Sequence, residues 1–458
     1  MKFCFDIMRM MCYNIHVIYT PCVKRFRCDH LLNTKYKSLL RFNQCWSHMY
    51  CNITRKGDVD FFYWLTKPVK IIIMILAKEG EIMNNKEIPH DLRKVAEEFL
   101  NSQKIVEIKE IESGHINKTY LVVMPECNYI LQEINTHVFN SPFGMMHNIK
   151  EVTEYIKKKL IYEGRDPNRA TLNIVTSRLG QDLVIYKNRY WRCMQYINGS
   201  KTYEIIESEE MFYEVGKAVG EFQFLLSDFH TRILDDTIRH FHDTPYRYEK
   251  FLDVIKLDRC NRVQECQEEI AFMHQHSVFF ADITSKLEKK IIPHRVTHND
   301  TKLSNVLLDE KTGKALCLID LDTVMKGSIL FDYGDALRIG ASIAAEDEVD
   351  LDKVRISLKL IDQFTRGFLS EVKDILWPEE AKSLYDGYLI ITCEIAMRFL
   401  HDYLDGDTYF RINHEKHNLE RARNQIKLVK EIESKEKEIK ALINQALKDL
   451  NYEEEFFS

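Results

Sequence analysis

The sequence lacks any hydrophobic run long enough to cross a membrane. A transmembrane helix needs about 20 consecutive apolar residues, whereas the longest candidate here is IIIMILA at 71–77. It also lacks a convincing secretion signal, and it shows no internal repeat. We therefore expect no membrane partner and no solenoid architecture.

Paired cysteines are missing as well. The chain has 12 Cys, but none form a CxxC pair or a spacing typical of metal ligands. Such cysteines are typical of reduced intracellular thiols, so we expect a cytoplasmic protein without a zinc site. A positive charge excess is absent too, since the formal charge is −6. That balance argues against nucleic acid as a partner.

The first 82 residues differ from the rest in composition. They carry 13 Lys and Arg against 6 Asp and Glu, which leaves −13 for residues 83–458. Lys78-Glu79-Gly80 can be encoded by a bacterial ribosome-binding sequence just ahead of Met83. We expect 1–82 to be a non-native upstream extension. The alternative is a genuine basic extension or targeting segment, although transit peptides are usually rich in Arg and Ser.

From Met83 onward, the sequence has enough apolar residues for a sizeable core (45% overall). A helical pattern at 83–102 is followed by segments with the two-residue period of strands. These patterns predict a five-stranded, mostly antiparallel sheet with one inserted helix. The strands are expected at 104–111, 118–124, 128–134, 182–186 and 190–197, and the helix at 146–161.

The second half reads mainly as helices. Ser208 is a predicted N-cap, and further helices are expected at 262–290, 350–372, 379–405 and 415–448. NVLLD and ALCLID form a predicted hairpin among them, with a turn at Gly313. The pattern indicates an α+β, two-lobed protein: a β-rich nucleotide-binding lobe at 83–197, and at 198–458 a helical lobe with the catalytic loop and acceptor site.

The stretch VTHNDTKLSNVLLDEKTGKALCLIDLDTVM (296–325) carries the chemistry. His298, Asp300 and Asn305 have the spacing H-x-D-x₄-N of kinase catalytic loops, and Asp320 ends the next strand. A lone Asp-Asn pair in a loop usually caps a turn, but this spacing between two apolar strands favours phosphoryl transfer. We expect a protein-kinase-like fold with Asp300 as base, Mg²⁺ on Asn305 and Asp320, and a bracing role for His298. Asp322, Asp332 and Asp335 are expected to cap or brace the metal loop.

The segments HNDTKLSNVLLD, LCLIDLDTV and FDYGDALR resemble the aminoglycoside phosphotransferase/choline kinase-like family, and within it the N-acetylhexosamine 1-kinases. The likeness covers nearly all of 97–432 and includes ESGHINKTYLV, YILQEIN, FHDTPYRYE and RFLHDYLDGDTYF…HNLERARNQIKLV. The resemblance implies an ATP- and Mg²⁺-dependent kinase that phosphorylates the anomeric hydroxyl of N-acetylglucosamine or N-acetylgalactosamine.

The nucleotide side is less regular. Gly114 alone stands in the loop where protein kinases have several glycines, and Gln132 occupies the position of the usual phosphate-binding Lys. Either another residue compensates for the lost charge, or the chain is a pseudokinase; the resemblance, which includes this Gln, favours compensation. We expect adenine to lie against the linker at Gln195 and Ile197.

The acceptor side is predicted from the resemblance, which implies sugar contacts for Arg398 and Tyr409. Arg398 could instead pair with Asp402 four residues on, and Tyr409 could belong to the core. His115 in the phosphate loop and Arg247 in FHDTPYRYE are further candidates beside Asp300. The alternative functions are a kinase of the same fold acting on an aminoglycoside, choline, homoserine or another sugar, and a non-catalytic pseudokinase. The oligomeric state is left open.

Overall fold

The computed structural model describes residues 90–100, 105–111 and 116–452. The predicted upstream extension 1–82 lies outside these residues, as do Gly114 and His115. In the described part of the chain, no helix is both long and apolar enough to cross a membrane.

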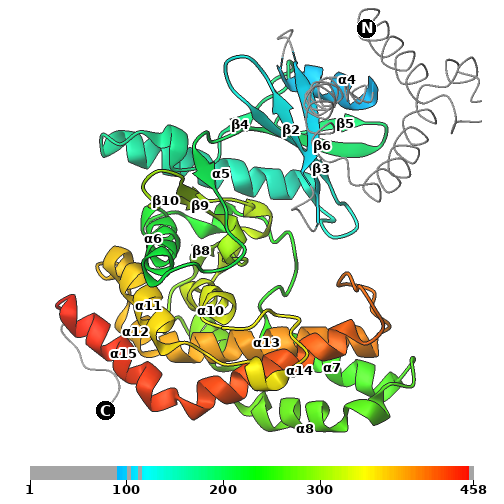
Figure 1. Ribbon diagram of the computed structural model, residues 1–458, viewed down its shortest axis with the longest axis vertical. Helices are drawn as coiled ribbons and strands as arrows, with labels where there is room; N and C mark the ends of the chain where they lie inside the picture. The colour runs from blue at the N-terminus through cyan, green and yellow to red at the C-terminus, as the bar shows by residue number, and fades with distance from the viewer. Residues whose placement is uncertain (1–89, 101–104, 112–115, 453–458) are drawn as a thin grey trace, which may run out of the picture. The chain divides into compact units, whose positions relative to one another are not determined.

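An antiparallel sheet of six strands comes first in the chain, ordered β1-β2-β3-β6-β4 with β5 paired to β6 (Figure 1). Helix α4 precedes the sheet and α5 connects β3 to β4. The bounds are α4 (His90–Leu100), β1 (Glu107–Ile111), β2 (Lys118–Val123), β3 (Tyr129–Ile134), α5 (Pro142–Tyr162), β4 (Ile174–Val175), β5 (Val184–Tyr186) and β6 (Arg189–Gln195).

The remainder is mainly helical, which confirms the predicted α+β architecture. Ser208 caps the first of these helices by accepting a hydrogen bond from Met211 N at 3.1 Å. The helices are α6 (Glu209–Leu225), α7 (Thr244–Leu257), α8 (Gln267–His276), α9 (Asp282–Glu288), α10 (Ile329–Gly340), α11 (Leu358–Val372), α12 (Pro378–Lys382), α13 (Leu384–Leu404), α14 (His417–Ser434) and α15 (Glu436–Asp449).

Two small sheets lie among these helices and carry the kinase-like motif. The predicted hairpin is present as β9 (Val306–Asp309) and β10 (Ala315–Leu318), joined by β7 (Ser200–Lys201). Strands β8 (Arg295–Thr297) and β11 (Met325–Gly327) pair with each other. Asp300 follows β8 and Asp320 follows β10, so the hairpin brings both residues to one end of the motif.

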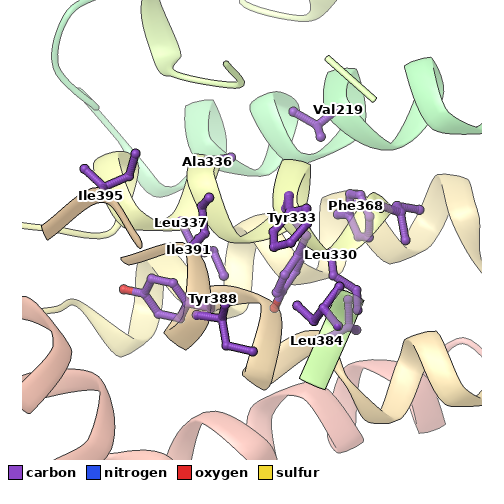
Figure 2. Packing of buried hydrophobic residues seen from close by; sticks show 14 of the residues in the cluster. Val219, Leu330, Tyr333, Ala336, Leu337, Phe368, Leu384, Tyr388, Ile391 and Ile395 are labelled. Carbon is purple, nitrogen blue, oxygen red and sulfur yellow. The ribbon is translucent and has the colours of Figure 1, made fainter. Parts of the chain in front are cut away.

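Two apolar cores stabilise the described residues. The smaller one joins α4 to the six-stranded sheet and includes Val95, Leu131 and Trp191. The larger one fills the helical part and also takes in the inner face of α5. Figure 2 shows its centre, where side chains of α6, α10, α11 and α13 interlock around Tyr333 and Tyr388.

Helices α10 and α13 approach each other closely at two glycines. A Cβ added to Gly334 would lie 2.6 Å from Gly387 O, and one added to Gly387 would lie 2.6 Å from Leu330 O. Side-chain atoms cannot be accommodated at such distances, so the two backbones are in direct contact here. This contact fixes the spacing between α10 and α13, which carry residues of opposite ends of the site described below.

Several sequence expectations were wrong in detail. The sheet has a sixth strand, β4, because a two-residue strand is too short to show a period. The helix expected at 262–290 is divided into α8 and α9 by a 3₁₀ turn at Ser277–Phe279. Helices α7 and α10 were not expected. The α10 sequence is buried on nearly all sides, so it shows no amphipathic stripe.

Candidate active site

The loop that carries Asp300 is held by a buried carboxylate of α10. Asp332 accepts hydrogen bonds from the backbone N–H groups of His298 and Asn299, both at 2.8 Å, and from Gln223 Nε2 at 2.7 Å. Thr301 adds a bond from its hydroxyl to Asp332 O. The predicted bracing role of Asp332 is therefore confirmed.

Asp300 combines negative charge with access from outside. Its Oδ2 atom lies 3.0 Å from Lys302 Nζ and accepts a hydrogen bond from Asn305 Nδ2 at 2.9 Å. Burial acts to raise the pKa of Asp300, but the charges of Lys302 and His298 and these hydrogen bonds outweigh it and lower the pKa. The side chain is 29% exposed. Asp300 is thus an ionised carboxylate that a hydroxyl group could reach.

His298 acts as a brace for this loop. Its ring is fully buried, and Nε2 lies 2.9 Å from Ile319 O. The contact ties the residue two before Asp300 to the residue just before Asp320. A ring buried and bonded in this way is unsuited to exchanging protons with a substrate, as the sequence indicated.

Asn305 and Asp320 are brought to the same end of the β9–β10 hairpin. Asn305 O accepts a hydrogen bond from Ile319 N at 2.8 Å. Asp320 adopts a left-handed backbone conformation with φ of 61°, which is uncommon for a residue other than glycine. Burial and the nearby charges of Asp322 and Asp300 raise the pKa of Asp320 to about 7. Negative charge is therefore concentrated where a cation would relieve it.

The donor set fits Mg²⁺ bound together with a nucleotide. Within the described ranges, no group of three or more His, Cys, Asp or Glu side chains converges as a metal cage. Mg²⁺ is usually held by one or two carboxylates together with substrate phosphates and water. The carboxylate of Asp320 and the amide oxygen of Asn305 are hard donors of this kind.

Gln132, which stands where a lysine is usual, contacts a buried arginine. Its cross-strand partner on β6 is Arg192, and Arg192 Nε donates to Gln132 Oε1 at 2.9 Å. Arg192 Nη1 also lies 2.5 Å from Asp322 Oδ1, and both side chains are at most 3% exposed. Asn117, which follows the phosphate loop, donates to Asp322 Oδ2 at 2.7 Å.

The predicted adenine contacts lie at the end of β6. Gln195 N donates to Asn173 O at 2.9 Å, and Ile197 O accepts from Ser200 Oγ at 2.6 Å. These two backbone groups are therefore used inside the chain.

Arg398 and Tyr409 meet in a cluster of aromatic rings. Arg398 Nη2 lies 3.4 Å from Tyr409 Oη, and its guanidinium carbon lies 5.2 Å from the centre of the Phe241 ring and 5.7 Å from that of Tyr409. These are cation–π distances. Tyr409 is 54% exposed, so the alternative that places it in the core is wrong.

Asp402 accepts hydrogen bonds from the loop that follows α13 and is not the partner of Arg398. Its carboxylate accepts hydrogen bonds from the backbone N–H groups of Thr408, Tyr409 and Phe410 at 2.7–2.9 Å. Asp402 is only 3% exposed. It therefore positions the loop that presents Tyr409, in place of the surface pair considered from sequence.

Arg247 forms an ion pair with a buried carboxylate, Glu394 of α13, and the charge of Arg398 also acts on this carboxylate. Glu394 is fully buried, lies 3.8 Å from Arg247 Nε, and accepts bonds from His242 (2.8 Å) and Thr244 (2.6 Å). Burial acts to raise the pKa of Glu394, but the charges of His242, Arg247 and Arg398 lower it. Burial and the charge of Arg398 lower the pKa of Arg247 to about 10.

A cavity of about 530 Å³ lies next to the catalytic loop and to the segment around Phe241. Its lining includes Asn299, the neighbour of Asp300, and Phe241, on which Arg398 stacks. A volume of this order is typical of small-molecule sites. Asp300, Asp320, Arg247, Arg398 and Tyr409 are not among its lining residues, so the cavity adjoins these side chains and does not contain them.

A model of the phosphotransferase enzyme family (APH) matches residues 107–368, which is more than half of the chain and includes the whole catalytic loop. This chain belongs to that family. It is therefore a kinase of the aminoglycoside, choline and ethanolamine kinase-like type. The match ends before Arg398 and Tyr409.

Individual relatives of this phosphotransferase are distant. An uncharacterized kinase-like protein of Caenorhabditis elegans is 30% identical over 106 residues, which is 23% of this chain and 26% of that protein. A microcompartment-associated aminopropanol kinase has 15% identity and a TM-score of 0.47, covering 76% of this chain and 98% of its own. A spectinomycin phosphotransferase solved with ADP and spectinomycin has 13% identity and a TM-score of 0.42, covering 72% and 94%.

Sequence reasoning missed three charged residues of this phosphotransferase. Lys302 stands two positions after Asp300. Burial acts to lower the pKa of Lys302, but the charges of Asp300 and Asp320 outweigh it and raise the pKa. Arg192 is a charged residue inside the apolar strand pattern YWRCM, and Glu394 is one inside the apolar helical stretch LIITCEIAM. A charge at a position expected to be buried is the signal that would have found the last two, because such charges need a partner.

Proposed function

We propose that this kinase transfers the γ-phosphoryl group of ATP to the anomeric hydroxyl of an N-acetylhexosamine, giving the sugar 1-phosphate. The observation that supports this acceptor is the pair Arg247 and Arg398 beside Tyr409. Two guanidinium groups with one buried counter-ion favour a neutral, hydroxyl-rich acceptor and repel a cationic one. Choline, ethanolamine and aminoglycosides are cationic and fit this cluster poorly.

In the proposed mechanism Asp300 orients the anomeric hydroxyl and accepts its proton during in-line attack. Lys302 holds the Asp300 carboxylate ionised and adds positive charge where the phosphoryl group passes. Arg398 and Tyr409 orient the sugar, with Arg247 beside them. His115, which lies outside the described residues, remains a predicted contact. Positioning and charge complementarity supply most of the acceleration in such reactions.

On the nucleotide side, Gln195 and Ile197 are proposed to contact the adenine, and Gly114 to lie in the loop over the phosphates. Asn305 and Asp320 would hold Mg²⁺. When bound, the ion neutralises charge on the phosphates and fixes their orientation. Asp320 contributes the anionic ligand and Asn305 the neutral one, while Asn305 also donates a hydrogen bond that orients Asp300.

The test is ADP release by the purified protein with Mg·ATP and a panel of acceptors. The panel contains N-acetylglucosamine, N-acetylgalactosamine, glucose, galactose, choline, ethanolamine, homoserine and kanamycin. We expect turnover on an N-acetylhexosamine and a phosphorus NMR signal of an anomeric phosphate ester. Preferred turnover of choline, ethanolamine or kanamycin would contradict the role given to the two arginines.

A further inference from the structure

Strand β3 lacks the usual lysine, and the neighbouring strand β6 supplies a positive charge at this position. In protein kinases, a lysine at this position pairs with an acidic group of a helix and so connects the sheet to the catalytic machinery. Here Gln132 has no charge to offer. However, its register partner on β6 is Arg192, whose guanidinium reaches the same place from the adjacent strand.

The contacts of Arg192 extend from the sheet to the loop that follows Asp320. Nε donates to Gln132 Oε1, and Nη1 forms a buried ion pair with Asp322, two residues after Asp320. Asn117 donates to the other oxygen of Asp322 and accepts from Asn135 N at 2.9 Å. Asp322 is thus held by Arg192 of β6 and by Asn117, the residue just before β2.

Such a pair is costly to bury, because both ions lose their hydration, and it is only stable when it is well bonded. Gln132 itself is oriented by a bond from its Nε2 to Thr119 Oγ1 at 3.0 Å. Gln132 is therefore oriented to accept from Arg192 Nε while Arg192 Nη1 lies at Asp322. An apolar pair could fill this space without placing charge beside the metal loop.

We propose that the Arg192–Asp322 pair, supported by Gln132 and Asn117, replaces the usual lysine pair and positions the metal loop against the nucleotide-binding sheet. Arg192 is in this view a positioning residue, and Gln132 is adapted to it. The proposal rests on the kinase assignment and on Asp320 as the ion's ligand, but it does not depend on which acceptor is used.

The test measures ADP binding by calorimetry with Mg²⁺ and with EDTA, so that no acceptor takes part. Removing Arg192 alone would leave Asp322 as an unpaired buried charge and could unfold the protein. The main variant is therefore the double substitution Arg192→Met/Asp322→Asn, which removes both charges. The matched control is Arg189→Met/Glu133→Gln, because this exposed pair joins the same two strands away from the loop.

We expect Mg²⁺ to tighten ADP binding at least 10-fold in the parent protein and in the Arg189/Glu133 control. In the double variant, Mg²⁺ should change the dissociation constant of ADP by less than about twofold. Binding in EDTA and the melting temperature should stay close to those of the parent. Arg192→Lys keeps a charge beside Asp322 and should retain most of the tightening.

A double variant in which Mg²⁺ still tightens ADP binding as in the parent would overturn the proposal, as would Arg192→Lys losing as much as the double variant. A parent protein that binds Mg·ADP but phosphorylates no sugar would contradict only the proposed acceptor. With an active acceptor, kcat of the double variant should fall about 100-fold with little change in acceptor KM, since misplacement of the reacting groups by about 1 Å has an effect of this size.

Discussion

At the proposed phosphate end of the site, Asp300 and Asp320 come from one stretch of the chain, whereas at the proposed acceptor end Arg247 comes from one stretch and Arg398 and Tyr409 from another. The first stretch is held by backbone hydrogen bonds to a buried carboxylate of α10. In the second set, backbone N–H groups of the Tyr409 loop donate to Asp402, and Arg247 pairs with Glu394 of another helix. Local sequence spacing determines the geometry of the first end, and tertiary packing determines that of the second.

The two ends also differ in charge. Carboxylates gather at the phosphate end, and burial together with Asp322 and Asp300 raises the pKa of Asp320 to about 7. At the proposed acceptor end, burial and the charge of Arg398 lower the pKa of Arg247. The two ends therefore carry opposite charge, and the proposed Mg²⁺ and neutral acceptor follow this difference. The following predictions test the two ends and the helices between them.

The largest effect is expected for Asp300→Asn, because the amide cannot accept the proton of the attacking hydroxyl. General bases contribute about 10²–10⁴-fold to rate, and we expect kcat to fall about 1,000-fold while the dissociation constant of Mg·ADP changes less than about threefold. Steady-state kinetics and calorimetry measure the two quantities. Asp253→Asn, an exposed carboxylate of α7, is the control and should behave like the parent. Near-parental turnover by Asp300→Asn would remove Asp300 from the mechanism.

Arg398→Met tests the acceptor end. The substitution removes the guanidinium that contacts Tyr409 and stacks on Phe241, so we expect kcat/KM for the acceptor to fall about 100-fold through a higher acceptor KM, at the upper range of a charged hydrogen bond. The KM for ATP should stay unchanged. If ATP KM rises and acceptor KM does not, Arg398 belongs to the nucleotide side and the division between the two ends is wrong.

A smaller effect is expected between the ends, in the α10–α13 contact shown in Figure 2. The hydroxyl of Tyr333 is bonded to Thr365 Oγ1 at 2.8 Å, whereas that of Tyr388 is buried without a hydrogen-bond partner among the described residues. Tyr333→Phe should therefore cost about 1 kcal/mol of unfolding free energy, and Tyr388→Phe should be neutral or slightly stabilising. Urea unfolding of the two variants makes the comparison, and equal losses would contradict it.

The smallest effect concerns His401 of α13. Burial and the charge of Arg247 lower its pKa, and this outweighs the opposite influence of Asp405 and Asp402. A histidine with a depressed folded pKa contributes stability that is present above the unfolded pKa of about 6.5 and is lost as the pH falls through the folded pKa. The parent should lose up to about 1.4 kcal/mol per pH unit more than His401→Gln below pH 6.5. Parallel urea-unfolding profiles of the two proteins would show that His401 is not perturbed.

The sequence was sufficient to predict the α+β architecture, the strands near Gln132 and the hairpin between Asn305 and Asp320. These features depend on short-range periodicity and on a fixed spacing. It was insufficient for α10, because a helix buried on all sides has no polar face, and for the contact between Arg192 and Gln132, which are 60 positions apart. Arg398 and Tyr409 were named from resemblance, but their shared environment with Arg247 required the fold.

The backbone contact between Gly334 and Gly387 has a consequence for changing the enzyme's acceptor. Helix α10 carries Asp332, which holds the catalytic loop, and α13 carries Glu394 and Arg398. Since main-chain atoms set the distance between these helices, replacing side chains at either end leaves the separation of the two ends unaltered. Acceptor-end residues on α13 and in the 241–247 segment could therefore be exchanged without changing the distance between the two ends of the site. New acceptors would then be selected by their polar and charged groups and not by their length.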